Sequence, residues 1–270
     1  MERIDWNSSR SFEVDGVSFS VENFVENPAE YIEELDKSGT LALFFPALAA
    51  THGVKQSPLK HAEGDVFAHK KMALGLLRKK TLSDERLGGI NNPEDLLLIA
   101  LALTHHDTGK KDRNEARARG LRLDHVGKSA EHAVEDLARF LSEEELAMVI
   151  EMIQKHEIMS STVQFPKRIQ GVQNLFSLSG KFAGARLLLK FSECDTLGRI
   201  INPAHPDAQN INMQNAAILE RNVRIHDFLN GQCDLLEAMA AGGRSPGRNV
   251  LISIHEQIGR IVFDGVLGKK

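Results

Sequence analysis

The sequence predicts an all-α fold: one compact helical bundle preceded by a short N-terminal extension. Residues 95–103 read DLLLIALAL, and a helix that is apolar on nearly every side is buried among others. Helix-start signals recur along the chain, whereas strand signals are nearly absent after residue 27. No internal repeat or biased linker divides the chain, so we expect an extension over residues 1–27 and one helical domain over residues 28–270.

The first third of the chain contains a strand signal followed by helix signals. Residues 16–21 alternate between polar and apolar side chains, which predicts a short strand or hairpin. Pro28 suits the first turn of a helix whose apolar face includes Tyr31, Ile32 and Leu35. A second apolar segment, 41–50, is broken at Pro46. Residues 65–80 then place apolar and basic residues at helical spacing.

Stronger helix signals follow. Asn92 is a predicted N-cap for the apolar helix, with acidic residues in the first turn. Ser142 and Glu145 form a predicted capping box that opens a helix ending near His156. Further helices are expected over residues 129–141, 181–198, 213–229, 235–241 and 248–263, with a breaker at 242–247.

Composition excludes several classes of protein. The formal net charge is -4, so no basic excess favours stable binding of duplex nucleic acid. The two cysteines fit no CxxC pattern and suit a reducing compartment, which predicts a cytoplasmic protein. The N-terminus lacks the apolar core of a signal peptide, and the longest apolar run is too short to span a bilayer. We expect no membrane partner.

The pair His106-Asp107 is the main functional signal. It follows the buried helix directly, where an imidazole and a carboxylate are costly unless something pairs with them. A divalent cation would do so. Other candidate ligands lie at or near helix ends or interrupt an apolar helix face: His69 with Asp65 four residues earlier, His125, His156 and Asp195.

The ligand types limit the chemistry of the site. Imidazole and carboxylate without thiolate suit Mn, Fe, Co, Ni, Mg or Zn, as one or two ions. Two ions within about 4 Å would clamp a phosphoryl group. Lys110 and Arg199 are placed to meet phosphate oxygens.

The remaining histidines are weaker candidates. His105 should point to a different side from His106, and His132 fits a solvated helix face equally well. Four others fit structural or surface positions: His52, His205, His226 and His255. A purely structural scaffold, with its histidines satisfied by ordinary hydrogen bonds, is the corresponding alternative for the whole chain.

The order of His69, His106-Asp107 and Asp195 resembles the signature of the HD superfamily of metal-dependent phosphohydrolases. The closer resemblance is to the HD module of bacterial tRNA nucleotidyltransferases (CCA-adding enzymes), over about residues 30–267. Segments that carry it are FPAL at 45–48, HAEGD at 61–65, THHDTGK at 104–110, DHVGKS at 124–129, KHE at 155–157 and DTLGR at 195–199, with tail pieces at 229–235 and 245–265. No GGxxRD-type stretch of a nucleotidyltransferase head is present, so CCA addition is not implied.

The resemblance implies a role for each residue. It assigns His69, His106, Asp107 and Asp195 to a first metal, and His125 and His156 to a second metal or to the phosphate. It makes Asp107, Lys110 and Arg199 the catalytic group. In this group the side chains of Lys110 and Arg199 neutralise negative charge in the transition state. The implied reaction is hydrolysis, by a metal-activated water, of a phosphomonoester or a 2',3'-cyclic phosphodiester of a nucleotide, RNA end or other small phosphorylated molecule.

The alternative function is a nucleotide- or RNA-binding sensor that keeps the metal site without turnover. The sequence leaves metal identity and oligomeric state open.

Overall fold

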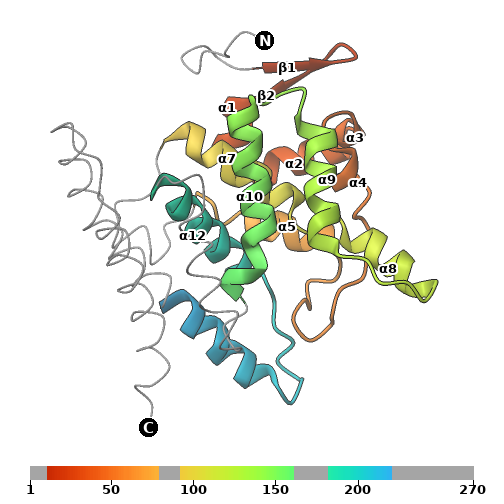
Figure 1. The fold of residues 1–270 in the computed structure, drawn as a ribbon, viewed down its shortest axis with the longest axis vertical. Coiled ribbons are helices and arrows are strands. Elements are labelled where there is room, and N and C mark those ends of the chain that lie inside the picture. Colours follow the sequence, from red (N-terminus) through yellow and green to blue (C-terminus); the bar gives the residue numbers. More distant parts are fainter. Residues whose placement is uncertain (1–10, 79–91, 161–181, 221–270) are drawn as a thin grey trace, which may run out of the picture.

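The computed structural model describes residues 11–78, 92–160 and 182–220, and this part of the chain is mostly helical, which confirms the predicted all-α class (Figure 1). The predicted hairpin is present: β1 (Ser11–Val14) pairs with β2 (Val17–Ser20) in antiparallel register. Its turn residues Asp15 and Gly16 both have positive φ, at 52° and 77°, as a two-residue type I′ turn requires.

Four helices follow the hairpin, and prolines open two of them. They are α1 (Val21–Glu26), α2 (Pro28–Lys37), α3 (Leu41–Phe44) and α4 (Pro46–Ala49). Pro28 and Pro46 each occupy the first helical position, where a missing N–H is tolerated. Phe19 of the hairpin and Phe24 of α1 are buried with Phe44 and Phe45, so the N-terminal segment from Ser11 onward is part of the same hydrophobic core.

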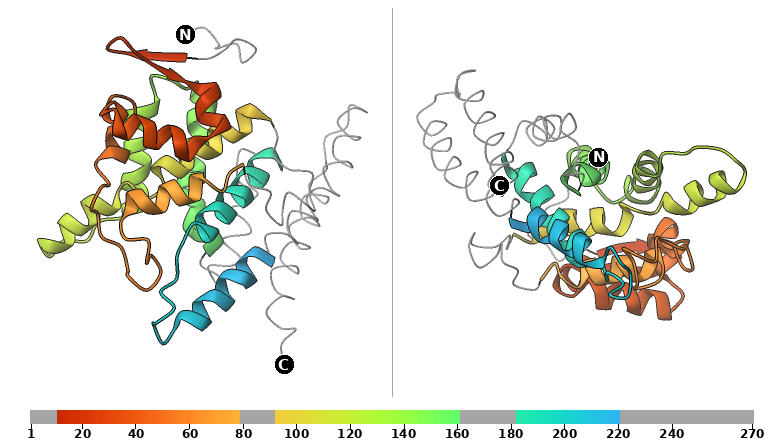
Figure 2. Two further views of the ribbon diagram at one scale, coloured as in Figure 1. Left: turned by 180° about the vertical axis from the view of Figure 1, so that it is seen from behind. Right: turned by 90° about the horizontal axis from the view of Figure 1, so that it is seen from below.

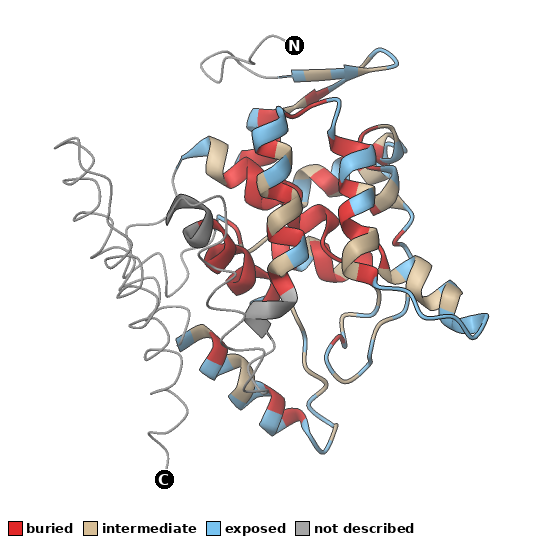
Figure 3. Ribbon diagram, viewed as in Figure 1, coloured by how far each residue is buried: buried red, intermediate tan, exposed pale blue. Residues whose placement is uncertain are grey.

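Helix α7 (Pro93–His105) forms the centre of the bundle. Residues 96–105 are all buried, as the apolar run predicted (Figure 3). Around it pack α1, α4, α5 (Val66–Leu74), α9 (His125–Leu137), α10 (Glu143–Ser160) and α12 (Phe182–Leu197). The side chain of Asn92 caps the start of α7 by accepting a hydrogen bond from the Glu94 N–H.

Local caps set the other helix starts. Ser142 and Glu145 make the predicted reciprocal capping box before α10. Helix α9 begins one turn earlier than the sequence suggested, because the Asp124 carboxylate accepts the N–H groups of Val126 and Gly127. His125 is therefore the first residue of this helix and does not lie before it.

Helix α8 (Lys110–Ala118) was not expected from the sequence pattern. It has no buried residue and projects from the side of the bundle (Figures 1 and 2). A helical stretch covers residues 208–220, the last of the described residues; it begins five residues before the helix predicted over 213–229, whose remainder lies outside the described residues. The helices predicted over 235–241 and 248–263 lie outside the described residues. In the described ranges we find no helix with the length and apolar content that a membrane span requires.

Candidate metal centre

The C-terminal end of α7 is where the predicted ligands meet. His106 caps this helix and Asp107 follows it. The other four come from four neighbouring helices and face the same place: His69 from α5, His125 from α9, His156 from α10 and Asp195 from α12. All six residues are buried. The structure therefore assembles the predicted set from segments that are far apart in the sequence.

Asp195 connects two of the histidines. Its Oδ1 lies 3.0 Å from Nε2 of His69 and 3.3 Å from Nε2 of His106. Its Oδ2 accepts a hydrogen bond from the Arg199 guanidinium. One carboxylate oxygen thus faces two imidazoles, and the other is neutralised by a cation.

Asp107 repeats this arrangement on the other side of His106. Its Oδ1 lies 3.6 Å from Nε2 of His125 and 4.0 Å from Nε2 of His156, and its Oδ2 accepts a 2.6 Å hydrogen bond from Lys110 Nζ. The same Oδ2 is 3.4 Å from Nε2 of His106. Asp107 therefore lies between the two halves of the centre, whereas the sequence placed it with the first half alone.

The histidine ring orientations show which nitrogen is free to bind. Nδ1 of His106 donates to the Leu103 carbonyl at 2.9 Å, and Nδ1 of His156 donates to the Ile153 carbonyl at 2.5 Å. In a neutral imidazole the other nitrogen, Nε2, then carries a lone pair. Each Nε2 is thus an acceptor turned toward carboxylate oxygens.

His106 provides the clearest test of whether a cation fits. Its Nε2 is buried and has no hydrogen-bond partner among the described residues. Burial lowers the pKa of His106 to about 4, so the ring is neutral at pH 7 and its contacts with Asp107 and Asp195 are not ion pairs. Two acceptors 3.3 Å apart repel each other unless a cation lies between them. The donor set therefore fits a divalent metal ion.

The carboxylates are held in the charged form. Burial alone would raise the pKa of Asp107, but the ammonium of Lys110 outweighs it and holds that pKa well below its ordinary value. The guanidinium of Arg199 likewise outweighs burial at Asp195 and holds the pKa of that carboxyl well below its ordinary value. Burial opposes protonation of His69, yet hydrogen bonds to Asp195 and Glu63 raise its pKa. Ionised carboxylates are the form that binds metal.

Two glycines allow the ligand-bearing helices to approach closely. A Cβ on Gly198, just after α12, would lie 2.8 Å from Cα of Ala73 in α5. A Cβ on Gly109, just after Asp107, would lie 2.3 Å from the carbonyl oxygen of His125 in α9. Both distances are far shorter than any real contact. These glycines bring Asp195 beside His69, and Asp107 beside His125.

Lys110 and Arg199, whose side chains were predicted to bind phosphate, lie at the edge of the centre. Lys110 Nζ donates to Asp107 and also to Gln56 Oε1 at 2.5 Å. Arg199 holds Asp195 on one side and on the other lines a cavity that also includes Lys60, Gln214 and Asn215. In the structure both cations contact ligand carboxylates.

Three other candidates lie away from the centre. Asp65 does not share a helix face with His69 as expected; its carboxylate caps α5 through the Ala68 N–H. His105 points to another side, as expected, and Nε2 of its ring lies 3.2 Å from Asp136 Oδ2. Nδ1 of His132 is within 3.1 Å of Thr108 Oγ1, and His132 belongs to none of the ligand groups.

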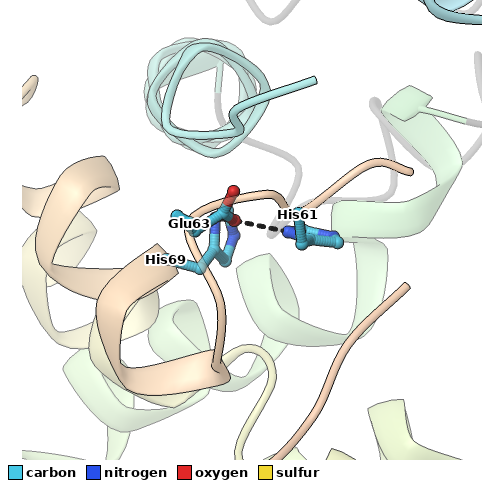
Figure 4. A group of neighbouring side chains, drawn as sticks. All are labelled: His61, Glu63 and His69. Atoms are coloured by element: carbon cyan, nitrogen blue, oxygen red, sulfur yellow. Dashed lines mark hydrogen bonds and ion pairs between the residues drawn. The ribbon is translucent and has the colours of Figure 1, made fainter. Parts of the chain in front are cut away.

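Two further residues lie at the centre, and no pattern in the sequence independently marks them as ligands. His61 and Glu63 lie in the loop before α5, and Glu63 contacts both His61 and His69 (Figure 4). Only the resemblance of the segment 61–65 drew attention to them. Their contacts depend on chain packing, so the pattern of the sequence could not reveal them.

Comparison of the chain with protein-family models, curated proteins and solved structures gave no match. The functional argument therefore depends on the geometry and chemistry of this centre.

Proposed function

We propose that this protein is a metal-dependent phosphohydrolase of the HD type, which cleaves a phosphomonoester or 2',3'-cyclic phosphodiester of a nucleotide or RNA end. The observation that carries the proposal is the repeated arrangement at Asp195 and Asp107. Each carboxylate turns one oxygen toward two imidazole Nε2 atoms and the other toward a cationic side chain. Two such half-sites side by side are suited to a pair of divalent cations.

The residues of the centre then have separate roles. His69, His106 and Asp195 would hold one cation, His125 and His156 the second, and Asp107 would bridge them. A divalent cation at this place polarises a phosphoryl group and lowers the pKa of water. Lys110 keeps Asp107 ionised, and a further N–H of its ammonium can donate to a phosphoryl oxygen.

Arg199 connects the centre to a place for the substrate. Its Nε is buried and has no hydrogen-bond partner among the described residues, and the cavity it lines adds the ammonium of Lys60 and two side-chain amides. Two cations attract a phosphate, and amides beside apolar walls suit the organic part of the ester. This supports a small phosphorylated substrate.

The first test combines hydrolysis with metal content. Protein loaded with Mn²⁺ or Ni²⁺ should hydrolyse at least one member of a panel of nucleoside monophosphates, 2',3'-cyclic nucleotides and RNA 3'-phosphates. The double variant H106A/D107A should lose metal and at least about 10³-fold in rate, since both half-sites lose a ligand. Activity that survives in this variant would contradict the proposal.

A matched pair of histidine variants on α9 tests the second half-site. His125→Ala removes a group that faces Asp107, whereas His132→Ala removes a group that contacts Thr108. We expect the first to lower kcat by about 10²-fold or more and the second to leave it unchanged. Equal effects would show that helix packing, and not metal binding, explains the loss.

The same protein samples address the alternatives. Calorimetric binding of a nucleotide without turnover, with metal present, would favour the sensor. Protein that binds no divalent metal at all would favour the scaffold.

A further inference from the structure

We propose that Glu63 is a positioning residue for the metal centre: its carboxylate takes the Nδ1–H of His69, so that Nε2 of His69 is presented to the cation shared with His106 and Asp195. His61 holds Glu63 in place. The inference rests on the proposed metal-dependent function, and it assigns a role to His61 and Glu63, which lie outside the predicted ligand set.

The three side chains form a buried group. Glu63 Oε1 accepts a 2.7 Å hydrogen bond from His61 Nδ1 and lies 3.3 Å from His69 Nδ1. The side chain of Glu63 is 2% exposed and that of His69 is fully buried. Figure 4 shows the carboxylate of Glu63 beside the ring of His69, with the hydrogen bond to His61 on its other side.

The direction of His69 follows from its two neighbours. Nε2 faces Asp195 Oδ1 at 3.0 Å, while Nδ1 faces Glu63 Oε1 at 3.3 Å and the Gly198 carbonyl at 3.4 Å. A neutral imidazole has one N–H and one lone pair. The oxygens beside both nitrogens can only accept, so a cation between Nε2 and Asp195 decides the tautomer: it would take the lone pair of Nε2, and the one remaining proton would belong on Nδ1, where Glu63 accepts it. A carboxylate behind a metal-binding histidine fixes its tautomer and strengthens it as a ligand.

The group has the composition of a metal site but is better suited to support one. His69 has a single lone pair, and in this tautomer it is directed at Asp195. Glu63 Oε2 is already committed to the backbone N–H of Ile200, at 2.9 Å. With Oε1 facing both histidines, each carboxylate oxygen of Glu63 already has a hydrogen-bond partner.

The backbone around Glu63 is tied to the segment that carries Asp195. The N–H of Ala62 donates to the Ile200 carbonyl at 2.8 Å, and the N–H of Asn202 donates to the Leu59 carbonyl at 3.0 Å. Glu63 is therefore anchored to the chain that leaves α12 just after Asp195 and Arg199. Its carboxylate fixes the ring of His69 relative to the carboxylate with which His69 would share the ion.

The test measures binding of Co²⁺ alone to the 270-residue chain, followed by the visible absorption of the ion and by metal content. Glu63→Gln keeps the shape and removes the charge, and we expect about 10- to 100-fold weaker binding of one ion, with an altered spectrum and the full number of ions still bound at saturation. The control is Glu131→Gln, an exposed carboxylate paired with Lys128 on α9, which should bind like the unmodified protein.

The outcomes separate the two proposals. If the unmodified chain binds no Co²⁺, the metal-dependent function itself fails. If it binds and Glu63→Gln binds equally well, only the role of Glu63 fails. Loss of one full ion, with the rest unaffected, would mean that Glu63 is itself a ligand and would overturn the positioning role.

A second measurement needs no variant. Nitrogen NMR of the histidines in the chain loaded with diamagnetic Zn²⁺ should place the one proton of His69 on Nδ1. A proton on Nε2 would overturn the inference.

Discussion

At the residue scale, the positively charged side chains of Lys110 and Arg199 each stabilise the ionised form of the carboxylate that they contact. Lys110 lies 2.6 Å from Asp107, and Arg199 is bonded to Asp195. Removing one member of a buried ion pair leaves an uncompensated charge. A substitution of Lys110 or Arg199 therefore changes the ionisation of the carboxylate beside it, in addition to removing any contact with the substrate.

Replacement of Lys110 tests this division. Lys110→Gln keeps a hydrogen-bond donor but removes the positive charge, so we expect kcat to fall by about 10²- to 10³-fold, a typical loss for a transition-state donor. The metal content should remain, because Lys110 is not a ligand. Steady-state kinetics together with elemental analysis give both quantities. An unchanged kcat would leave Lys110 a purely structural role.

Lys70 is a buried cation that the sequence did not single out. It is fully buried next to His69, and its Nζ donates a 2.6 Å hydrogen bond to the Thr104 carbonyl near the end of α7. Burial lowers the pKa of Lys70 from 10.5 to about 7. The charged form therefore destabilises the folded chain, although the hydrogen bond secures the helix end that carries His106.

The lowered pKa of Lys70 determines the direction in which the free energy of unfolding changes with pH. Between about pH 7 and pH 10.5 the unfolded chain keeps the Lys70 proton and the folded chain loses it, so the free energy of unfolding rises with pH. The penalty is full below pH 7. In metal-free protein the stability of Lys70→Met should lack this slope, which is at most about 1.4 kcal/mol per pH unit. If the free energy of unfolding changes equally with pH in both proteins between pH 7 and pH 10, the assignment of this slope to Lys70 is wrong.

At the element scale, the centre depends on how closely α12 approaches α5 and how closely the turn after Asp107 approaches α9. Gly198 and Gly109 occupy the two contact points, and neither leaves room for a side chain. Such positions set the distance between ligands without belonging to the ligand set.

Alanine substitutions at glycine measure this effect. Gly198→Ala should push α12 away from Ala73 and separate Asp195 from His69, which weakens metal binding and destabilises the fold by about 1–3 kcal/mol. Gly75→Ala is the matched control, because a Cβ there meets its neighbours at 3.4 Å or more and φ is -65°. Calorimetry and a metal titration on both variants check the prediction. If both variants have the same stability and the same metal affinity, the close approach at Gly198 does not determine the geometry of the centre.

The capped starts of α7 and α10 were the most predictable features, and α8 was the least. The caps at Asn92 and at Ser142 act within a few residues, so the sequence reveals them directly. Helix α8 buries no residue and has no apolar stripe, so the signal on which helix prediction depends is absent.

At the scale of the whole molecule, metal ions in this centre would link α7 to the four neighbouring helices that carry the other candidate ligands. Binding to the folded chain alone stabilises it by mass action, about 2.7 kcal/mol at a hundred-fold excess over the Kd. We expect saturating Mn²⁺ to raise Tm by about 5–10 °C over protein treated with chelator. The variant H106A/D107A should show no such shift, and a shift of equal size in it would place the metal elsewhere.

The sequence by itself determined the helical class, the buried central helix and the identity of the residues that gather at its end. These follow from apolar periodicity and from caps, which are local properties of the chain. Tertiary structure decided where the residues lie: that Asp107 faces both halves, that Asp65 caps a helix, and that Glu63 lies between His61 and His69. His69 and Asp195 are 126 positions apart, and only the packing of α5 against α12 fixes which of their atoms meet.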